Sequence, residues 1–286
     1  MGIHILADAG GTSLKWFVRD EKNGVEYQFH IEGLSPLYLT EEEIDAKLRA
    51  AFPSTDYCLR VTSVEYYGTG CAADQAPWRI QTVLERLFPR ASVLVDSDMM
   101  GAARVMWGSS KGIVGIIGTG SNAGFFDGKT VDYARPSLGY LLGDEGSGAW
   151  LGRHLLRDWL YGTLAPVLAN ALYEEYGRPL GLIPCGTHVE STEPVMQRLF
   201  RGERPNQFLA SFAPFLSRHL DDPYCANLVA QGMDTYVTSL VLPNVCGNNR
   251  ALKMVGSVAY AFHAALAEAC ARHGIELLQV KKDALP

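Results

Sequence analysis

The chain has 286 residues, of which 48% are hydrophobic and 20% are charged, and its formal net charge is -6. This length favours two domains of comparable size, and the composition is typical of a soluble globular protein. The acidic balance, without clustered lysines and arginines, gives no electrostatic basis for binding nucleic acid or an anionic membrane.

The sequence also lacks the usual signs of export or membrane insertion. It enters an apolar strand directly, without a basic region and signal segment, and no apolar run approaches the length of a membrane span. Its six cysteines stand apart without a C-x-x-C pair, which argues against a local zinc or redox motif and favours reduced thiols. We therefore expect a cytoplasmic protein.

The first part of the chain has the element order of a mixed sheet covered by helices. Residues 3–18 read as strand, Gly/Thr/Ser turn and strand, and residues 25–31 alternate like a half-buried third strand. Thr40 and Glu43 form a capping box, which opens a helix that ends before Pro53. The order continues with a strand (61–70), a helix (78–88) and a short strand (92–95).

The second part begins with a copy of the opening meander at residues 113–133. Most of residues 146–242 reads as helix, interrupted by a Gly/Pro loop at 177–186. The chain then continues with a strand (252–255), a turn (Gly256-Ser257), a helix (258–272) and a final strand (275–280).

We expect two lobes from this order. The N-terminal α/β lobe covers residues 1–105, and the C-terminal α/β lobe covers residues 106–286 with a helical insertion at about 146–242. The boundary is placed in the segment 99–112, where a hinge would let the lobes close on a ligand.

Two glycine turns occupy equivalent places in the two copies. Gly11-Thr12 lines up with Gly118-Thr119, and each turn joins two apolar strands. Successive backbone N–H groups in such a turn form a concavity suited to an anionic oxygen. Either turn alone could equally be an ordinary hairpin tip, but two copies suggest a duplicated architecture that binds a polyphosphate from both sides.

Other nucleotide motifs are excluded. The sequence has no G-x-x-x-x-G-K-[ST]. The run from Gly118 to Gly124 is one residue too long for G-x-G-x-x-G and leads into a strand instead of a helix, so a dinucleotide fold fails too.

Five motifs in order carry a resemblance that covers nearly the whole chain. They are Asp8-Ala-Gly-Gly-Thr12, Asp98-Met-Met-Gly101-Ala102, Gly118-Thr-Gly-Ser-Asn122, Gly143-Asp-Glu-Gly-Ser147 and Val255-Gly-Ser-Val-Ala259. The sequence resembles the sugar kinase, Hsp70 and actin superfamily, and within it the N-acetylglucosamine kinases of the BadF/BadG/BcrA/BcrD ATPase family. The resemblance implies a two-lobed, duplicated ribonuclease H-like α/β fold with a helix-rich second lobe, and ATP and Mg²⁺ as cofactors.

The resemblance also implies roles for individual residues. Asp98, after a short buried strand, would be the general base that takes the proton of a sugar hydroxyl, with Asp96 as the alternative base. A purely structural alternative is that either aspartate caps the helix starting near Met99. Asp8 would hold Mg²⁺ through its water shell, and Lys15 either adds charge there or points into solvent. The implied ATP contacts are Gly10, Gly11, Thr12, Ser13, Gly118, Thr119, Gly120, Gly256 and Ser257.

Another set of residues resembles the sugar contacts of the family. Ser121, Asn122 and Asp144 match these contacts, since carboxylate and amide groups suit a polyol. Ser137 and Gly139 are placed to line the same pocket. In N-acetylglucosamine kinases an Asn after the third strand also reaches the sugar, and here that loop contains Ser35 instead. Asp144 and Glu145 have the alternative role of placing negative charge at the helix N-terminus near Gly146.

The function implied is ATP-dependent phosphorylation of the 6-hydroxyl of N-acetylglucosamine or N-acetylmuramate. A BadF-type ATPase that activates a reductase or dehydratase is an alternative, although the scattered cysteines do not suit a shared iron-sulfur cluster. A non-catalytic sugar sensor is a third. The expected partner is a small amino sugar, with neither nucleic acid nor membrane, and a homodimer is expected by resemblance alone. Family members usually continue into a closing helix, so the end at Pro286 implies a shortened C-terminus with impaired lobe closure.

Overall fold

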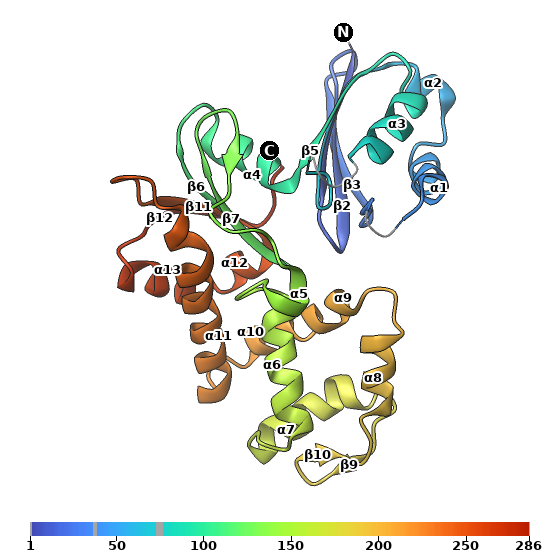
Figure 1. Cartoon of the computed structure of the whole chain (residues 1–286). Helices are drawn as coiled ribbons and strands as arrows, with labels where there is room; N and C mark the ends of the chain where they lie inside the picture. The colour runs from blue at the N-terminus through green and yellow to red at the C-terminus, as the bar shows by residue number, and fades with distance from the viewer. Residues whose placement is uncertain (1, 37–38, 73–76, 286) are drawn as a thin grey trace. The chain divides into compact units, whose positions relative to one another are not determined.

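A computed structural model describes residues 2–36, 39–72 and 77–285 of the chain (Figure 1). Within these ranges it has two five-stranded sheets, ordered β3-β2-β1-β4-β5 and β12-β11-β6-β7-β8. Reading the second order from β8 gives the same succession of three meander strands followed by two later strands. The predicted duplicated α/β fold is therefore confirmed.

The first sheet and its helices take up the chain as far as Trp107. Their bounds are β1 (Ile3–Ala9), β2 (Ser13–Asp20), β3 (Val25–Glu32), α1 (Glu41–Ala51), α2 (Thr55–Cys58), β4 (Val61–Gly68), α3 (Trp78–Leu87), β5 (Ser92–Ser97) and α4 (Asp98–Trp107). β1 pairs antiparallel with β2 and parallel with β4, and β4 pairs parallel with β5.

Helices α1 and α3 cover one face of this sheet (Figure 1). Trp16 and Tyr66 lie fully buried in the core on that face, with Phe52 at the end of α1. Helix α4 packs on the other face, because Gly101 lies against Tyr67: a Cβ at Gly101 would be 2.6 Å from the Tyr67 Cβ. Side chains alternate along β1 and β2: the fully buried set faces α1 and α3, and the other set faces the side of the sheet on which α4 packs.

In the second half of the chain, a helical region is inserted between the third and fourth strands of the second sheet, counted in sequence order. The strands are β6 (Gly112–Ile117), β7 (Ser121–Phe126), β8 (Val131–Asp132), β11 (Ala251–Val255) and β12 (Glu276–Lys281). The helices are α5 (Gly139–Leu142), α6 (Gly148–Leu160), α7 (Pro166–Leu172), α8 (Glu193–Phe200), α9 (Pro205–Ala210), α10 (Ala213–Arg218), α11 (Pro223–Tyr236), α12 (Ser257–Ala261) and α13 (His263–Arg272).

Three short helical turns and one small hairpin complete the elements. They are the π-helical turns Tyr173–Gly177 and Val237–Val241, the 3₁₀ turn Leu242–Asn244, and the strands β9 (Pro184–Cys185) and β10 (His188–Val189).

Most elements follow the sequence prediction, and two differ. The capping box of Thr40 and Glu43 is confirmed, with both of its hydrogen bonds formed. The predicted helix 258–272 is wrong as a single element: it divides at buried Phe262, whose backbone (φ -108°, ψ 31°) leaves the helical region. The insertion is also more broken than predicted, because a proline is the first residue of α7, α9 and α11 and the second residue of α8.

The chain divides into two compact units. One consists of Met1–Val114, Gly124–Asp132 and Asp283–Pro286, and the other of Gly115–Ala123 and Tyr133–Lys282. We call them unit 1 and unit 2. All six cysteines are free thiols, and no helix among the described residues is long and apolar enough to cross a membrane.

Candidate active site

In unit 1, the sheet register aligns two of the predicted carboxylates. Asp8 of β1 pairs with Tyr67 of β4, and Tyr67 pairs with Asp96 of β5. Residues in one row of a parallel sheet point to the same face, so Asp8 and Asp96 flank Tyr67 on the face that α4 covers. The carboxyl ends of the three strands thereby bring together residues that are 88 positions apart in sequence.

Asp98 follows this row as the first residue of α4. The helix is capped by Ser97, whose Oγ accepts a hydrogen bond of 3.2 Å from the Met100 N–H. The structural alternative, in which Asp96 or Asp98 caps this helix, is therefore wrong. Each carboxylate instead accepts the N–H of the residue that follows it, at 2.7 Å for Asp96 and 2.9 Å for Asp98.

The electrostatics of a neighbouring thiol show that both carboxylates lie near it. Burial, followed by the charges of Asp98 and Asp96, raises the pKa of the Cys71 thiol to about 12. Cys71 is therefore an inert thiol at neutral pH.

The first glycine turn, Gly10 to Ser13, rests directly on another glycine. The Gly10 N–H donates to the Ser13 carbonyl at 3.0 Å, and the Gly33 N–H donates to the Thr12 carbonyl at 3.0 Å. A Cβ at Gly33 would lie 2.7 Å from the Gly10 carbonyl oxygen. Sequence reasoning missed this role of Gly33, and Ser35 lies two residues further along the same loop.

The chain's final residues pack beside Asp8. The Ala284 N–H donates to Asp8 Oδ2 at 3.2 Å, and Asp283 Oδ2 lies 2.6 Å from Lys15 Nζ. Lys15 is therefore paired, which corrects the reading that it points freely into solvent. Burial raises the pKa of Asp8, against the opposing effects of the Ala284 N–H and the Lys15 charge.

In unit 2, the second glycine turn lies against the start of α6. The Gly148 N–H donates to the Gly118 carbonyl at 2.9 Å, and the Ala149 N–H donates to the Thr119 carbonyl at 3.0 Å. A Cβ at Gly118 would meet nothing within 4 Å among the described atoms. The predicted Gly118–Asn122 motif is thus hydrogen-bonded to the two residues that directly follow the predicted Gly143–Ser147 motif.

Asp144 joins these two motifs. Its Oδ1 accepts the Ser121 N–H at 3.2 Å, and Ser121 Oγ donates to the Glu145 carbonyl at 2.8 Å. Among the described residues other than glycine, only Asp144 has a backbone in the left-handed region, with φ 54°. Burial raises its pKa, the Ser121 N–H opposes this, and the Glu145 charge adds to it.

A cavity of about 90 Å³ lies beside Asp144. Four predicted sugar contacts line it, namely Ser121, Asn122, Ser137 and Asp144. Gly139 is not among the lining residues; it starts α5 with φ 65°. Arg135, Leu138 and Leu240 also line the cavity and were not predicted from the sequence. Arg135 and Leu138 could have been found, because they lie within two residues of the predicted Ser137.

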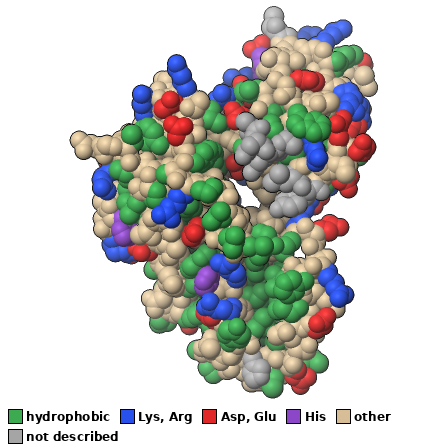
Figure 2. All heavy atoms as spheres, viewed as in Figure 1, with side chains coloured by type: hydrophobic (Ala, Val, Ile, Leu, Met, Phe, Trp, Pro, Cys, Tyr) green, Lys and Arg blue, Asp and Glu red, His purple; other side chains and the backbone are tan. Residues whose placement is uncertain are grey.

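Hydrophobic side chains gather at the surface around α5 (Figure 2). Leu138, Leu141 and Leu142 expose 55%, 69% and 78% of their surface. Exposed leucines in this number beside a polar cavity are typical of a surface that binds a ligand or partner.

The turn Gly256-Ser257 lies close to the end of β6. Gly256 has φ 130°, and a Cβ there would be 2.2 Å from the Ile117 carbonyl oxygen. Because Ile117 precedes Gly118, the predicted adenosine turn and the predicted phosphate turn lie at the same end of the second sheet.

Metal ligation by protein side chains alone is not evident. No group of three or more His, Cys, Asp or Glu side chains among the described residues is placed to hold a metal ion. Mg²⁺ needs fewer protein ligands than such a group supplies, since it commonly keeps several waters and takes one or two carboxylates plus substrate phosphates. Asp8, with Asp96 in its row, fits that requirement.

Comparison with solved structures identifies the class of fold. The chain matches a ROK-family transcriptional regulator homologous to the E. coli MLC protein, with a TM-score of 0.52 and 13% identity over 97% of this chain and 74% of that one. It matches a provisionally assigned N-acetylglucosamine kinase from Chromobacterium violaceum with a TM-score of 0.70 and 16% identity, over 99% and 96%. The fold is therefore the α/β fold of sugar kinases and their relatives.

A third structure defines the family. It is a provisionally assigned N-acetylglucosamine kinase from Porphyromonas gingivalis, with a TM-score of 0.85 and 33% identity over 99% of this chain and 95% of that one. The chain belongs to the N-acetylglucosamine kinase-like sugar kinases. No protein-family model matches the sequence, and no protein of curated function matches it either.

Proposed function

We propose that this sugar kinase transfers the γ-phosphoryl group of ATP to the 6-hydroxyl of an N-acetylated amino sugar. The observation that supports this proposal best is the environment of Asp144. Its carboxylate is largely buried, its backbone is in the left-handed region, and it accepts a hydrogen bond from the Gly118–Asn122 turn. Strained, desolvated residues of this kind cluster at binding sites. Family membership supplies the reaction class.

The residues that line the cavity of unit 2 suit one part of such a sugar, since a volume of about 90 Å³ is well below the roughly 300 Å³ of a pocket that encloses a whole ligand. The Asp144 carboxylate can accept hydrogen bonds from two neighbouring hydroxyls, and the Asn122 amide can donate and accept. Leu138 and Leu240 offer apolar surface to an acetyl methyl group. Arg135 lines the same cavity and would suit the carboxylate of a lactyl group, as in N-acetylmuramate.

Asp98 is proposed as the general base. It takes the proton of the 6-hydroxyl while that oxygen forms a bond to the γ-phosphorus, and the bond from the γ-phosphorus to the bridging oxygen of ADP breaks. Its place as the first residue of α4 holds it fixed, because Ser97 caps the helix and Gly101 seats it on Tyr67. Asp96 remains the alternative base.

The nucleotide contacts are assigned to the two glycine turns. Backbone N–H groups of Gly10 to Ser13 and of Gly118 to Gly120 would hold phosphate oxygens, and the Gly256-Ser257 turn would face the adenosine. Asp8 would hold Mg²⁺ through water. Bound there, Mg²⁺ would neutralise charge on the phosphates during transfer.

The test is sugar-dependent release of ADP. Purified protein with Mg-ATP is assayed with N-acetylglucosamine, N-acetylmuramate, glucose, glucosamine and no sugar. We expect turnover with at least one N-acetylated sugar well above the rate without sugar. A sugar-independent rate would favour an ATPase activator instead, and sugar binding without turnover would favour a sensor.

A further inference from the structure

Tyr67 occupies the middle of the row that Asp8, Tyr67 and Asp96 form across β1, β4 and β5. The proposed reaction uses the flanking carboxylates and leaves the Tyr67 hydroxyl without a role. Tyr67 is 4% exposed, and burial, followed by a hydrogen bond to Glu65, raises its pKa to about 12, so the hydroxyl stays neutral near pH 7. A buried hydroxyl requires hydrogen-bond partners, and these partners show what it holds in place.

The Tyr67 hydroxyl joins strand β4 to helix α4. It donates to Glu65 Oε2 at 2.8 Å and accepts a hydrogen bond from Arg104 Nη1. Because a guanidinium group can only donate, the direction of both hydrogen bonds is fixed. The Arg104 guanidinium carbon also lies 5.5 Å from the centre of the Tyr67 ring, which is typical of a cation–π contact. We call Glu65, Tyr67 and Arg104 the α4 clamp.

Helix α4 contacts the Tyr67 side chain at two places along its length. At the fourth residue of the helix, a Cβ at Gly101 would lie 2.6 Å from the Tyr67 Cβ, so glycine allows this close approach. Three residues later, Arg104 holds the hydroxyl at the other end of the same side chain. Residues three apart lie on one face of a helix, so the two contacts together fix the rotation of α4 and its position along its axis.

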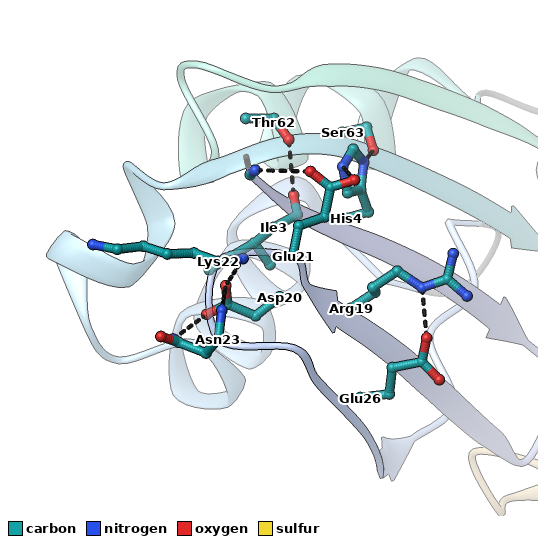
Figure 3. Close-up of polar contacts among 11 residues, drawn as sticks. Ile3, His4, Arg19, Asp20, Glu21, Lys22, Asn23, Glu26, Thr62 and Ser63 are labelled. Atoms are coloured by element: carbon teal, nitrogen blue, oxygen red, sulfur yellow. Dashed lines mark hydrogen bonds and ion pairs between the residues drawn. The ribbon is translucent and has the colours of Figure 1, made fainter.

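Strand β4 is itself held in register with β1 at the opposite end of both strands (Figure 3). Thr62 Oγ1 donates to the Ile3 carbonyl at 3.2 Å, and Ser63 Oγ is hydrogen-bonded to His4 Nδ1 at 2.7 Å. These contacts lie where the β1–β4 register shifts, between Ile3 and His4. Tyr67 is therefore carried by a strand whose register is fixed by side chains as well as by the backbone.

We propose that the α4 clamp positions Asp98 for catalysis, with Tyr67 and Arg104 as positioning residues that act through the helix. This inference rests on the proposed role of Asp98 as general base. Asp98 is the first residue of α4, about 9 Å along the axis from Arg104, so a shift or rotation of the helix moves its carboxylate. A general base must lie within about 2.6–3.2 Å of the hydroxyl oxygen, and a misplacement of about 1 Å can cost about a hundredfold in rate.

A purely structural role for the same contacts makes a different prediction. If the clamp only stabilises unit 1, its loss affects turnover by the same factor whether or not Asp98 is present. If the clamp positions Asp98, its loss slows turnover only while that carboxylate is there to be misplaced. The two roles are therefore separated by combining each clamp variant with Asp98→Asn.

The first test is this double-mutant cycle, measured on kcat. Tyr67→Phe keeps the ring and loses both hydrogen bonds, and Arg104→Met keeps an extended side chain and loses the guanidinium. We expect each to lower kcat about tenfold on its own, with the KM for ATP and for sugar changed less than about twofold, and to cause no further loss in Asp98→Asn. Equal losses with and without Asp98, or no loss in the single variants, would overturn the proposal.

Two matched controls accompany the cycle. Tyr57→Phe removes another tyrosine hydroxyl of unit 1, bonded to Tyr27 at 2.8 Å and packed beside the core on the α1 and α3 face, so kcat should be unchanged. Glu65→Gln keeps an oxygen that can accept from the Tyr67 hydroxyl, so kcat should stay within about twofold of wild type. A loss in Tyr57→Phe as large as that in Tyr67→Phe would reject a specific role for the clamp.

A second test does not depend on turnover. Hydrogen exchange of the α4 amides, followed by mass spectrometry, should be about fivefold faster in Tyr67→Phe and Arg104→Met, since each loses a hydrogen bond that seats the helix. Tyr57→Phe should leave it unchanged. Unchanged exchange in the clamp variants would overturn the proposal whatever the reaction. If these variants exchange faster but Asp98→Asn turns over like wild type, the proposed base is wrong instead, and the clamp has no catalytic role.

Discussion

Asp144 has a backbone conformation that aspartate adopts at a cost and a carboxylate that burial makes harder to ionise. Its folded pKa lies above the ordinary value of 3.8, so the ionised form is destabilised in the folded protein at any pH above that folded pKa. In the proposed function the ionised carboxylate is the form that accepts hydrogen bonds from the sugar hydroxyls. Under that proposal, the side chain lowers the stability of the folded protein and contributes to binding.

Two results are expected from Asp144→Asn. The KM for sugar should rise about tenfold to a hundredfold, since hydrogen bonds to a charged acceptor contribute about 1.5–3 kcal/mol. At neutral pH the variant should also unfold at a higher temperature, because asparagine removes the buried charge and tolerates the left-handed backbone. Wild type should lose this disadvantage as the pH falls below 3.8. An unchanged KM would remove Asp144 from the sugar site.

The pH dependence of wild type follows from the same shift. Because the pKa of Asp144 is raised, its carboxylate protonates at a higher pH than an exposed aspartate does. The KM for sugar should therefore begin to rise at a higher pH than an exposed aspartate would give, and this rise should be absent from Asp144→Asn. Steady-state kinetics of both proteins between about pH 4 and pH 8 measure it, and the same acid-side rise in both would contradict the assignment.

Asp98→Asn and Asp96→Asn separate the two candidate bases. Removing the base should lower kcat by about 10²-fold to 10⁴-fold with little change in ATP affinity. We expect this loss for Asp98→Asn and less than about a tenfold loss for Asp96→Asn, whose backbone contact to Ser97 an asparagine can keep. The reverse order would move the base to Asp96.

At the level of elements, two glycines hold the hairpin tips in different ways. Gly33→Ala puts a methyl group against the Gly10 and Gly11 carbonyls, so it should displace the first tip, raise the KM for ATP and destabilise the protein by about 1–3 kcal/mol. Gly118→Ala adds a methyl group with no described atom within 4 Å, so it should raise the KM for ATP with little loss of stability. Chemical denaturation and ATP kinetics on both variants test the contrast.

Local patterns predicted most of the elements. The paired glycine turns, the capping box at Thr40 and the alternation along β3 are signals carried within a few residues. The break at buried Phe262 was not predicted, because residues 257–272 contain neither glycine nor proline to mark it. The alignment of Asp8 with Asp96 depends on strand register across 88 residues, which no local pattern specifies.

At the level of the whole molecule, the last residues belong to unit 1 although the preceding strand belongs to unit 2. Ala284 and Leu285 are buried there, with exposures of 6% and 4%. Their packing beside the first strands depends on contacts across nearly the whole chain, so the sequence did not predict it. The same contacts engage Asp8 and Lys15.

A chain ending at Lys282 should therefore be less stable. Loss of Leu285 burial alone corresponds to about 1.5–3 kcal/mol, measurable as a lower free energy of unfolding in urea. The matched control is Asp283→Ala, which removes only a partly exposed ion pair worth about 0–1 kcal/mol. Equal stability of the shortened chain and wild type would show that this segment does not anchor unit 1.

The central claim is transfer of phosphate to the 6-hydroxyl of an N-acetylated amino sugar. The most direct test is phosphorus NMR of the product formed from Mg-ATP and the sugar that gives turnover. We predict one new phosphomonoester whose phosphorus couples to the two protons on C6. Coupling to the anomeric proton would place the phosphate on O1, and the absence of any sugar phosphate with ATP consumed would contradict the kinase assignment.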